Sequence, residues 1–557
     1  MIQLQQVKLK IPHTKAEIEK KVCKILRISR NQLLSMQISR RSLDARRKPD
    51  LSYVYTLEIE VKDESSLKKR WKQNRSIQFH PPVPPYSYQV SGTRNLSYRP
   101  VIAGTGPAGL FCGYALAKMG YRPILLERGA SVEERRKDVE TFWKTGRLDP
   151  ESNVQFGEGG AGTFSDGKLN TLVHDPDGRG REVLRLFVQY GAPEEILYDS
   201  KPHIGTDKLI QIVRSMRNAI IEMGGEFHFH SRMTGIDLAD QADGSPRLKA
   251  VLVENTADPQ AEEKIPADLL VLAIGHSARD TFAMLAENQF SMEPKAFAVG
   301  VRVEHPQQMI DERQYGGTPE SRASRGLPSA AYKLTANLPN GRGVYTFCMC
   351  PGGYVVNASS EPGYLAVNGM SYSGRDGENA NSAVIVTVRP EDYPGSGPLS
   401  GVEFQRELEK AAYRAGKGKI PVQLFEDFCE NRCSEGPGAF APQIKGSYTW
   451  SNLRDIFPEE IAESLKEGIL AFDRKIPGYA RKDAVMSGVE SRTSSPVRIL
   501  RDKDCLEANV KGVYPCGEGA GYAGGITSAA MDGLKVARMI SQTYRPFDKD
   551  CEVSCEV

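Results

Sequence analysis

The stretch Val101–Gly129, VIAGTGPAGLFCGYALAKMGYRPILLERG, decides the fold of this chain. A short apolar run ends at Gly104, and Gly104, Gly106 and Gly109 then form a G-x-G-x-x-G turn. Such a turn lets the backbone bend tightly, approach a pyrophosphate and pack a helix closely against a strand. The helix that follows, expected over 110–119, points its N-terminal N–H groups and its dipole at that phosphate.

A second apolar run, 123–126, ends at Glu127, where a carboxylate is placed to accept hydrogen bonds from a ribose hydroxyl. Two other segments, beginning at Gly157 and Gly519, fit the same glycine pattern. Only the first copy has a strand before it, a helix after it and an acid beyond it, so this copy predicts a dinucleotide site. The alternative is a chance glycine turn between an ordinary strand and helix.

The composition is that of an ordinary globular protein. The chain has 557 residues, which predicts roughly three to four domains, and 40% of its residues are hydrophobic and 26% charged. No apolar run reaches the ~20 residues needed to span a bilayer, and the first residues do not read as a signal peptide. We expect a cytoplasmic protein whose ten cysteines are reduced thiols.

Charge is concentrated at the N-terminus. Residues 1–99 contain 21 Lys and Arg against 8 Asp and Glu, so they carry +13 in a chain whose total is +3. Periodicity over the first 80 residues predicts a small α+β module of strand, helix, strand, strand and helix. The charge favours RNA or an acidic protein as partner, although the module has no aromatic platform or known nucleic-acid motif. A solvated basic face, or a patch docked on the acidic remainder of the chain, is the alternative.

The pattern along the chain predicts a discontinuous Rossmann-like α/β domain that is interrupted by an inserted α+β substrate domain. The expected boundaries are 1–80 for the basic module, 81–95 for a Pro-rich linker, 96–293 and 487–545 for the α/β domain, 294–486 for the inserted domain and 546–557 for an acidic tail.

The matching pieces of the site are far apart in the sequence. A buried strand is expected over 266–274 and stops at Gly275, and Cys516-Gly-Glu-Gly-Ala-Gly521 follows roughly 390 residues after Glu127. A nicotinamide-binding Rossmann domain is normally contiguous over ~150 residues, so this spread indicates an extended FAD. Here the chain resembles the glutathione-reductase-like class of FAD proteins, whose late motif is an apolar strand ending in Gly-Asp. In this chain Glu518 takes the place of that Asp, which keeps the carboxylate and adds a methylene.

Longer phrases narrow the resemblance. They are GGAGTFSDGKL from Gly159, FCMCPGG from Phe347, VNGMS from Val367, GVESRTSSP from Gly488 and CGEGAGYAGG from Cys516. With these phrases nearly the whole chain is similar to the bacterial family of uncharacterised FAD-dependent dehydrogenases. The resemblance implies a bound FAD and the inserted-domain architecture, and it supplies no substrate.

The cofactor-binding residues are expected in these motifs. Gly159 and Gly160 leave N–H groups open for a flavin phosphate or the pyrimidine edge, or they belong to a flexible surface loop. The last helix opens at Ile526, and its dipole would favour negative charge on the flavin, or the glycines before it form a simple helix cap. Met233 would grip adenine through its main chain. The full predicted set is Gly104, Gly106, Pro107, Ala108, Gly109, Glu127, Arg128, Gly159, Gly160, Met233, Gly275, Gly517, Glu518, Gly524, Gly525 and Ile526.

Two residues are candidates for catalysis. Lys168 is expected either to offset negative charge at flavin N1/O2 or to be a surface lysine. Arg492 would hold a substrate carboxylate or phosphate by two hydrogen bonds, or it forms a salt bridge with Glu490 or Asp483. His276 follows the strand end at Gly275, and we interpret it as a loop residue.

Cys348 and Cys350 invite a redox interpretation. In a strand they point to one face, and a disulfide closing so small a ring is strained. The helix after the glycine turn holds only Cys112, so a dithiol mechanism is not expected. The other spaced pairs would bind zinc only if they converged, and we expect no metal there: Cys429 with Cys433, and Cys551 with Cys555.

These patterns predict an FAD-dependent oxidoreductase that transfers a hydride through flavin N5 to or from an unidentified small molecule. No second complete fingerprint is present, so NAD(P)H, if it is a transient electron donor, has no domain of its own. The competing hypothesis is a flavoprotein whose basic module binds RNA or a protein partner, with FAD in a structural or sensing role.

Overall fold

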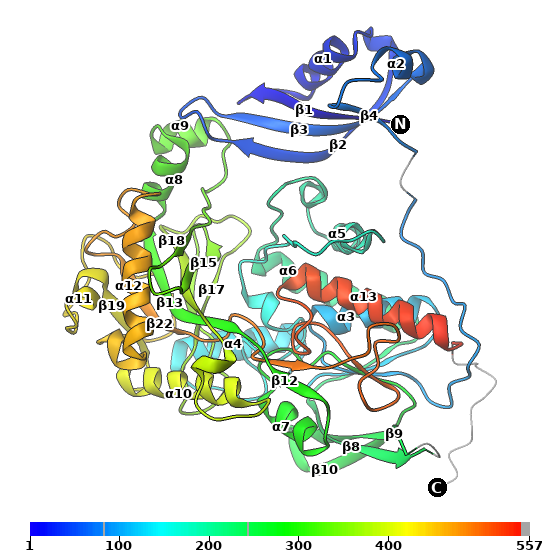
Figure 1. Cartoon of the computed structure of the whole chain (residues 1–557), viewed down its shortest axis with the longest axis vertical. Coiled ribbons are helices and arrows are strands. Elements are labelled where there is room, and N and C mark those ends of the chain that lie inside the picture. Colours follow the sequence, from blue (N-terminus) through cyan, green and yellow to red (C-terminus); the bar gives the residue numbers. More distant parts are fainter. Residues whose placement is uncertain (82–83, 242–243, 547–557) are drawn as a thin grey trace.

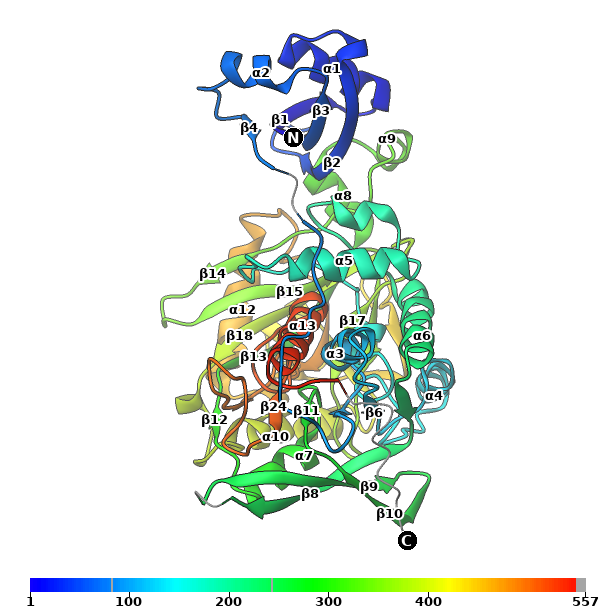
Figure 2. The same ribbon diagram turned by 90° about the vertical axis from the view of Figure 1, so that its right-hand side faces the viewer.

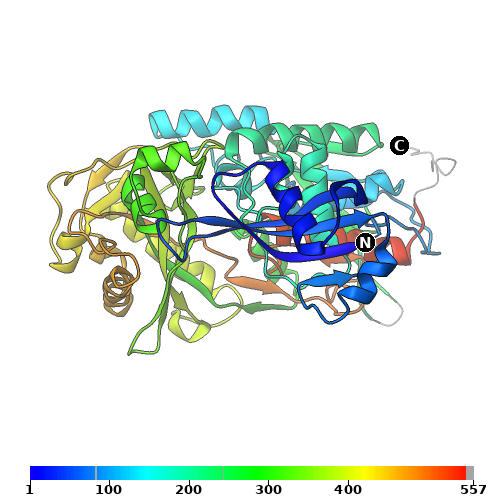
Figure 3. The same cartoon turned by 90° about the horizontal axis from the view of Figure 1, so that it is seen from above.

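The computed structural model describes residues 1–81, 84–241 and 244–546. The remaining residues of the predicted linker and acidic tail, 82–83 and 547–557, lie outside this part. Figures 1 and 2 show a small N-terminal unit at one end of the long axis and a larger body at the other. Seen from above, the body has two halves, one coloured green to orange and the other mainly cyan, blue and red (Figure 3).

The N-terminal unit is an antiparallel sheet in the order β2-β3-β1-β4 with two helices on one face (Figure 1). Its element order, βαββαβ, is the ferredoxin-like arrangement. A capping box starts the first helix, since Glu17 N donates to Thr14 Oγ1 at 3.3 Å and Thr14 N to Glu17 Oε2 at 2.7 Å. The elements are β1 (Ile2–Lys10), α1 (Lys15–Leu26), β2 (Leu33–Asp44), β3 (Ser52–Val61), α2 (Glu64–Arg70) and β4 (Ile77–Phe79).

The N-terminal unit is attached to the body at two places. Arg41 of β2 forms two hydrogen bonds with the Asp199 carboxylate, at 2.6 and 2.9 Å. Its backbone also receives a bond from Ser200 N at 2.8 Å. At the second place, Arg325 donates to Pro49 O at 2.9 Å. Residues 91–94 of the predicted linker are also ordered, because they hydrogen-bond to the end of the last helix.

One half of the body is built on a parallel sheet in the order β24-β11-β5-β6-β7. Its middle strands are short, apolar and buried on both sides, as expected for a parallel sheet covered on both faces. All five carboxyl ends lie at the same edge. The strands are β5 (Val101–Ala103), β6 (Ile124–Leu126), β7 (Glu226–His228), β11 (Leu270–Leu272) and β24 (Val513–Pro515).

Helices cover one face of the parallel sheet. α3 and α13 cross closely because Gly533 has no side chain, and a Cβ there would lie 2.2 Å from Ala108 O. The helices and 3-10 turns of this half are α3 (Pro107–Lys118), α4 (Val132–Thr145), η2 (Ala161–Phe164), α5 (Arg179–Gln189), η3 (Glu194–Leu197), α6 (Thr206–Glu222), α7 (Arg279–Glu287) and α13 (Ile526–Thr543).

The opposite face packs against a three-stranded antiparallel sheet of β8 (Ser231–Asp240), β9 (Pro246–Asn255) and β10 (Asp258–Pro266). The prediction of a single buried strand over 266–274 gave the wrong length. Pro266 ends β10, and only 270–272 belong to the parallel sheet, because the chain crosses from one sheet to the other between them.

The other half is a mixed sheet in the order β14-β15-β18-β13-β22-β19-β21, here called the seven-stranded sheet. In the sequence it lies between β11 and β24 of the parallel sheet. Strands β12 (Met292–Pro294) and β23 (Val497–Ile499) pair where the chain leaves and returns. The elements are β13 (Phe297–Pro306), α8 (Gln307–Tyr315), α9 (Pro319–Ser324), β14 (Thr335–Asn337), β15 (Gly343–Cys350), β16 (Tyr354–Asn357), β17 (Val367–Met370), β18 (Asn379–Val388), α10 (Ser400–Ala415), β19 (Ile420–Leu424), α11 (Phe425–Cys429), β20 (Ile444–Lys445), β21 (Tyr448–Trp450), α12 (Glu459–Asp473) and β22 (Val485–Glu490), with β17, β16 and β20 in a small sheet of their own.

Candidate cofactor and substrate site

A pocket lies at the carboxyl ends of β5, β6 and β11 and extends to the seven-stranded sheet. It encloses about 1500 Å³ of space, part of it open to solvent. Of the predicted cofactor-binding residues, all except Gly109, Gly159 and Gly517 line this pocket, and so do Lys168 and Arg492. Segments separated by hundreds of residues therefore meet around one cavity.

The three exceptions are packing glycines beside the pocket. A Cβ on Gly109 would lie 1.9 Å from Gly104 O, and one on Gly517 would lie 2.6 Å from Ala108 Cβ. At Gly159 a Cβ would lie 2.2 Å from the Thr163 hydroxyl oxygen. These positions hold the turn, the helix and the loop together and do not face the cavity.

The first helix start in the pocket belongs to α3. Gly106 precedes this helix, and no side chain caps it. Gly104 has a φ of +99°, and a Cβ there would lie 2.4 Å from Ala273 O. Gly160 approaches the same turn so closely that its Cβ would lie 3.0 Å from Gly106 Cα. The exposed N–H groups and the helix dipole make this corner suitable for a phosphate.

The second helix start belongs to α13, whose N-terminus also has no side-chain cap. A Cβ built on Gly275, Gly524 or Gly525 meets no atom within 4 Å, so each would extend into free space. All three residues line the pocket. The chain therefore presents bare backbone to the cavity at this end, as a closely held planar ligand requires.

Glu127 is buried and already accepts four hydrogen bonds. One oxygen accepts from Thr105 N at 3.1 Å and from the Thr105 hydroxyl at 2.6 Å. The other accepts from Gly129 N at 3.1 Å and from Gly157 N at 3.0 Å. The carboxylate thus joins three loops around the pocket, and the predicted ribose contact would have to share these oxygens.

Glu518 differs from Glu127 in its hydrogen bonding. It lines the pocket, and its carboxyl forms no hydrogen bond with any residue that the structure describes. Burial raises the pKa of Glu518 to about 7, against the opposing effect of Lys295. Glu518 is partly exposed to the cavity, and a carboxyl there that no described residue binds fits a hydroxyl-bearing ligand such as the ribityl chain of FAD.

The β6 end of the pocket has a flat, partly apolar wall. The Arg128 guanidinium stacks over the Phe156 ring at 4.1 Å, and its nitrogens bind Glu151 at 2.7 Å and Asp280 at 2.9 Å. Met233, at the start of β8, is buried and lines the same end. These contacts fix the side chains where the adenine is expected.

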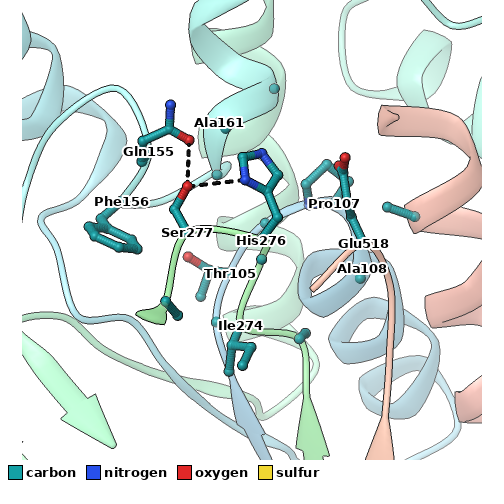
Figure 4. A pocket seen from close by; sticks show the side chains of 18 of the residues that line it. Thr105, Pro107, Ala108, Gln155, Phe156, Ala161, Ile274, His276, Ser277 and Glu518 are labelled. Atoms are coloured by element: carbon teal, nitrogen blue, oxygen red, sulfur yellow. Dashed lines mark hydrogen bonds between the residues drawn. The ribbon is translucent and has the colours of Figure 1, made fainter. Parts of the chain in front are cut away.

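His276 lies on the loop that follows β11, and it lines the pocket. Its Nδ1 lies 3.1 Å from the Ser277 hydroxyl, which donates to Gln155 Oε1 at 3.0 Å (Figure 4). Because that hydroxyl proton is used, Nδ1 of His276 is the donor and Nε2 is left as an acceptor. Burial lowers the pKa of His276 to about 4, and the charge of Arg492 acts in the same direction. The ring is therefore neutral near pH 7.

Lys168 reaches the pocket from the glycine-rich loop. Its ammonium hydrogen-bonds to Met349 O and lies 3.1 Å from the Asp166 carboxylate. Asp166 also accepts from Arg375 at 2.6 Å and from the Ser371 hydroxyl at 2.5 Å. Burial raises the pKa of Asp166, but the charges of Lys168 and Arg375 outweigh it and hold the pKa below the usual value. This corner carries two cations around one carboxylate.

A salt bridge was the predicted alternative role of Arg492. The structure shows a salt bridge, but with a different partner. Its guanidinium binds neither Glu490 nor Asp483, but forms two hydrogen bonds with Glu409, at 2.9 and 2.8 Å. A third nitrogen donates to the Ser360 hydroxyl at 2.5 Å. Most of its donors are therefore used within the protein, and this weakens the case for a substrate clamp.

The seven-stranded sheet and the neighbouring β17 contribute residues that sequence reasoning did not single out as site residues. Cys348 on β15, Asn368 on β17 and Glu490 on β22 line the pocket. All three are bound to the buried guanidinium of Arg302. Each lies inside a phrase that supported the family resemblance except Arg302, whose place on β13 has no local motif.

The cysteines of the described chain are free thiols. β15 bulges between Phe347 and Cys350, and Cys350 Sγ donates to Cys348 O at 3.2 Å. Burial raises the pKa of Cys348 to about 11 and that of Cys350 to about 12. In the described residues no group of three His, Cys, Asp or Glu could hold a metal ion. Cys551 and Cys555 lie outside them.

A parallel sheet with a glycine turn, two uncapped helix starts and an unpartnered carboxyl defines a dinucleotide-binding fold that fits FAD. Residues 296–493 match the family model described as "FAD-dependent protein, C-terminal domain-like", and residues 1–60 match a domain of unknown function. The family model thus supports FAD as the cofactor. Across the described residues no helix is long and apolar enough to cross a membrane.

The chain is 46% identical to an uncharacterised protein of Clostridium beijerinckii over 546 residues, which is 98% of this chain and 99% of that protein. It therefore belongs to the same family as that protein.

Solved structures give weaker likenesses. The chain is 11% identical to Escherichia coli quinol fumarate reductase FrdA, covering 81% of this chain and 71% of that one, with a TM-score of 0.34. For the flavin-dependent brominase Bmp2 the identity is 12%, the coverage 80% and 79%, and the TM-score 0.34. TM-scores this low carry no argument about function.

Proposed function

We propose that the chain is an FAD-dependent oxidoreductase of the glutathione-reductase-like class, acting on a small molecule that binds against β15, β17 and β22. The observation that carries the proposal is the single pocket bounded by the starts of α3 and α13, helices about 400 residues apart in the chain. FAD bound there would supply a flavin whose N5 exchanges a hydride with the substrate.

Different residues would bind different parts of FAD. The turn from Gly104 to Gly109 and the start of α3 would hold the pyrophosphate, with Met233 and Arg128 at the adenine. Glu518 would bind the ribityl hydroxyls. The start of α13 would lie at the pyrimidine edge, where its dipole favours negative charge on the ring and raises the reduction potential.

The substrate side of the pocket is held by buried charges. Residues 294–486 would form the substrate domain, with 96–293 and 487–545 as the domain that holds FAD. Lys168 would place its positive charge where the flavin ring meets the substrate, beside N1 and O2 of the ring. The neutral His276 can accept a hydrogen bond at Nε2, but it does not offer a proton there.

The test is purification of the full chain followed by release and quantification of its flavin. We expect a yellow protein with close to one FAD per chain, bleached under anaerobic conditions by at least one of NADH, NADPH or a panel of metabolites. A colourless protein that takes up no FAD at high concentration would overturn the proposal. Bleaching by NADH or NADPH would identify the electron donor.

A second candidate function rests on the surface of the N-terminal unit. Five exposed cations form no ion pair with a described residue: Lys21 and Lys24 on α1, Lys68 and Lys69 on α2, and Lys72 just after α2. Such a set of cations suits the phosphates of a single-stranded RNA, and FAD would then have a structural or sensing role.

Fluorescence anisotropy with a labelled U20 RNA tests this second candidate. Binding should weaken steeply with salt, and the double variant K68E/K69E should weaken it further. K410E/K419E, two exposed lysines of the body, is the control. Equal effects of both pairs would show that the N-terminal surface has no special role.

A further inference from the structure

One buried cation organises the wall of the pocket opposite the glycine turn. Arg302 on β13 is fully buried, and its guanidinium binds Glu490 through Nε at 2.8 Å and through Nη2 at 3.1 Å. The same group donates to Cys348 O at 2.8 Å and to Asn381 Oδ1 at 3.2 Å. Four strands are thereby held in one arrangement by a single side chain.

Arg302 also fixes the orientation of the Asn368 amide. Asn368 Oδ1 accepts from Arg302 Nη2 at 2.7 Å and from Gly369 N at 2.7 Å. Both partners are donors only, so the oxygen end of the amide must face them. Gly369 is needed here, because a Cβ at this position would lie 2.4 Å from Arg302 Nη1. The NH2 end of Asn368 is left over.

That NH2 group has no partner among the residues that the structure describes. Asn368 lines the pocket, and Nδ2 forms no hydrogen bond with any residue of the described chain. A donor held rigidly at a pocket wall and left unpaired predicts an acceptor oxygen on whatever binds there.

The charges around this wall favour an anion. The Glu490 carboxylate is neutralised by Arg302, and Arg492 by Glu409. Asp166 faces two cations, Lys168 and Arg375.

Two neighbouring titratable groups add no negative charge. His203, 4.0 Å from Asp166, is neutral because burial lowers its pKa to about 4, with Arg375 acting in the same direction. Burial keeps the Cys348 thiol protonated near neutral pH. Around Asp166 the two cations thus outnumber the one carboxylate that they bind.

We propose that Asn368 Nδ2 and Lys168 Nζ form a subsite for a carboxylate of the substrate. The proposal rests on the proposed function, since it takes the pocket to be the site where substrate meets flavin. It narrows the substrate class to small organic acids, and it gives Arg302 a positioning role.

The experiment uses the FAD-loaded full chain and two probes of equal length and opposite charge, propionate and propylamine. Each is titrated while the flavin absorbance is recorded, and binding is checked by calorimetry. We expect propionate to perturb the spectrum and bind, and propylamine to do neither. Asn368→Asp keeps the shape and replaces the donor by an oxygen, so it should weaken propionate binding by about tenfold to a hundredfold.

Controls separate binding from folding. Asn31→Asp, an exposed change in the N-terminal unit, should leave propionate binding unchanged. FAD content and melting temperature are measured for every variant. If Asn368→Asp does not fold, Asn368→Ser and Lys168→Met are used, and each should weaken propionate binding with FAD retained.

Several outcomes would overturn the subsite. They are equal responses to propionate and propylamine, no response of the wild type to 100 mM propionate, or unchanged binding in variants that fold and retain FAD. A chain that holds no FAD would instead refute the proposed function, so the two failures are distinguishable.

Discussion

Removing the Glu409 carboxylate should destabilise the protein more than any exposed charge change on the same helix. Glu409 has no exposed surface and accepts five hydrogen bonds, two from Arg279, two from Arg492 and one from Ser491. Glu409→Gln keeps the shape and removes the charge between two buried guanidinium groups. Breaking such a buried pair costs about 3–5 kcal/mol.

The control lies on the same helix, α10. Glu403 pairs with Arg406 at 3.2 Å in an exposed position, and an exposed pair of this kind contributes about 0–1 kcal/mol. Urea unfolding followed by tryptophan fluorescence should show the midpoint of Glu409→Gln lowered by about 1 M or more. The midpoint of Glu403→Gln should stay within about 0.5 M of the wild type.

The pH dependence gives a second measurement. Although burial raises it, Arg279 and Arg492 bring the pKa of Glu409 well below its usual value. The folded chain then keeps the carboxylate charged while the unfolded chain takes up a proton near pH 4.3. The advantage of the wild type over Glu409→Gln should be complete above about pH 5 and decline at lower pH. Equal midpoint shifts for the two variants, or a difference that grows on acidification, would refute the reasoning.

Three further predictions concern the glycines and Glu518 of the site and the attachment of the N-terminal unit. Gly524→Ala should fold normally but lose FAD, because its Cβ enters the pocket and meets no protein atom, whereas Gly109→Ala should lose both FAD and stability, since its Cβ collides with Gly104 O; flavin content and melting temperature separate the two. Glu518→Gln should make the FAD-free protein more stable than wild type above about pH 8 and equal to it below about pH 4.5, because burial raises the pKa of Glu518 to about 7 in the folded chain, so the wild type loses stability as pH rises from the pKa of the unfolded chain, about 4.3, to that of the folded chain; a thermal shift series across pH measures it. Arg41→Ala should loosen the N-terminal unit, seen as faster limited proteolysis between this unit and the body with FAD retained, because it removes both hydrogen bonds to Asp199.

The glycine turn could be predicted because everything that shapes it is local. An apolar run, three glycines, a helix and a second run lie within 30 residues, and β5, α3 and β6 form there with small differences in their ends. Gly104 and Gly109 are informative for the same reason, since a Cβ on Gly104 would collide with Ala273 O, just after β11, and a Cβ on Gly109 would collide with Gly104 O. Local pattern and fold agree where the interactions are short in sequence.

The wall of the seven-stranded sheet could not be predicted in this way. Arg302 binds Cys348, Asn368 and Glu490, which lie 46, 66 and 188 positions away in the chain. A sequence shows that these residues are polar, but not which strand neighbours which. The same limit explains Arg492. The nearby acids looked like its partners, but Glu409, 83 positions away, is brought to it by α10.

The strand expected over 266–274 shows a further limit. The residues from 269 to 273 are apolar and buried, but only 270–272 of them belong to β11. A continuous apolar run marks burial, and it does not mark the point at which one sheet ends and another begins. The pattern of hydrophobicity therefore does not show where the chain passes from one sheet to the other.

The charged and titratable groups of the pocket lead to one expectation about pH. Glu490 is tied to Arg302 and Arg492 to Glu409 by ion pairs. His276 and Cys348 have pKa values of about 4 and about 11, both far from neutral. Glu518 has its pKa near 7, and its carboxyl has no hydrogen-bond partner in the described part of the chain. A change in flavin absorbance or FAD affinity between pH 6 and 8 should therefore follow the protonation of Glu518, and it should disappear in Glu518→Gln. If it persists in that variant, another group on the pocket wall titrates, and the assignment of Glu518 to the ribityl chain loses its support.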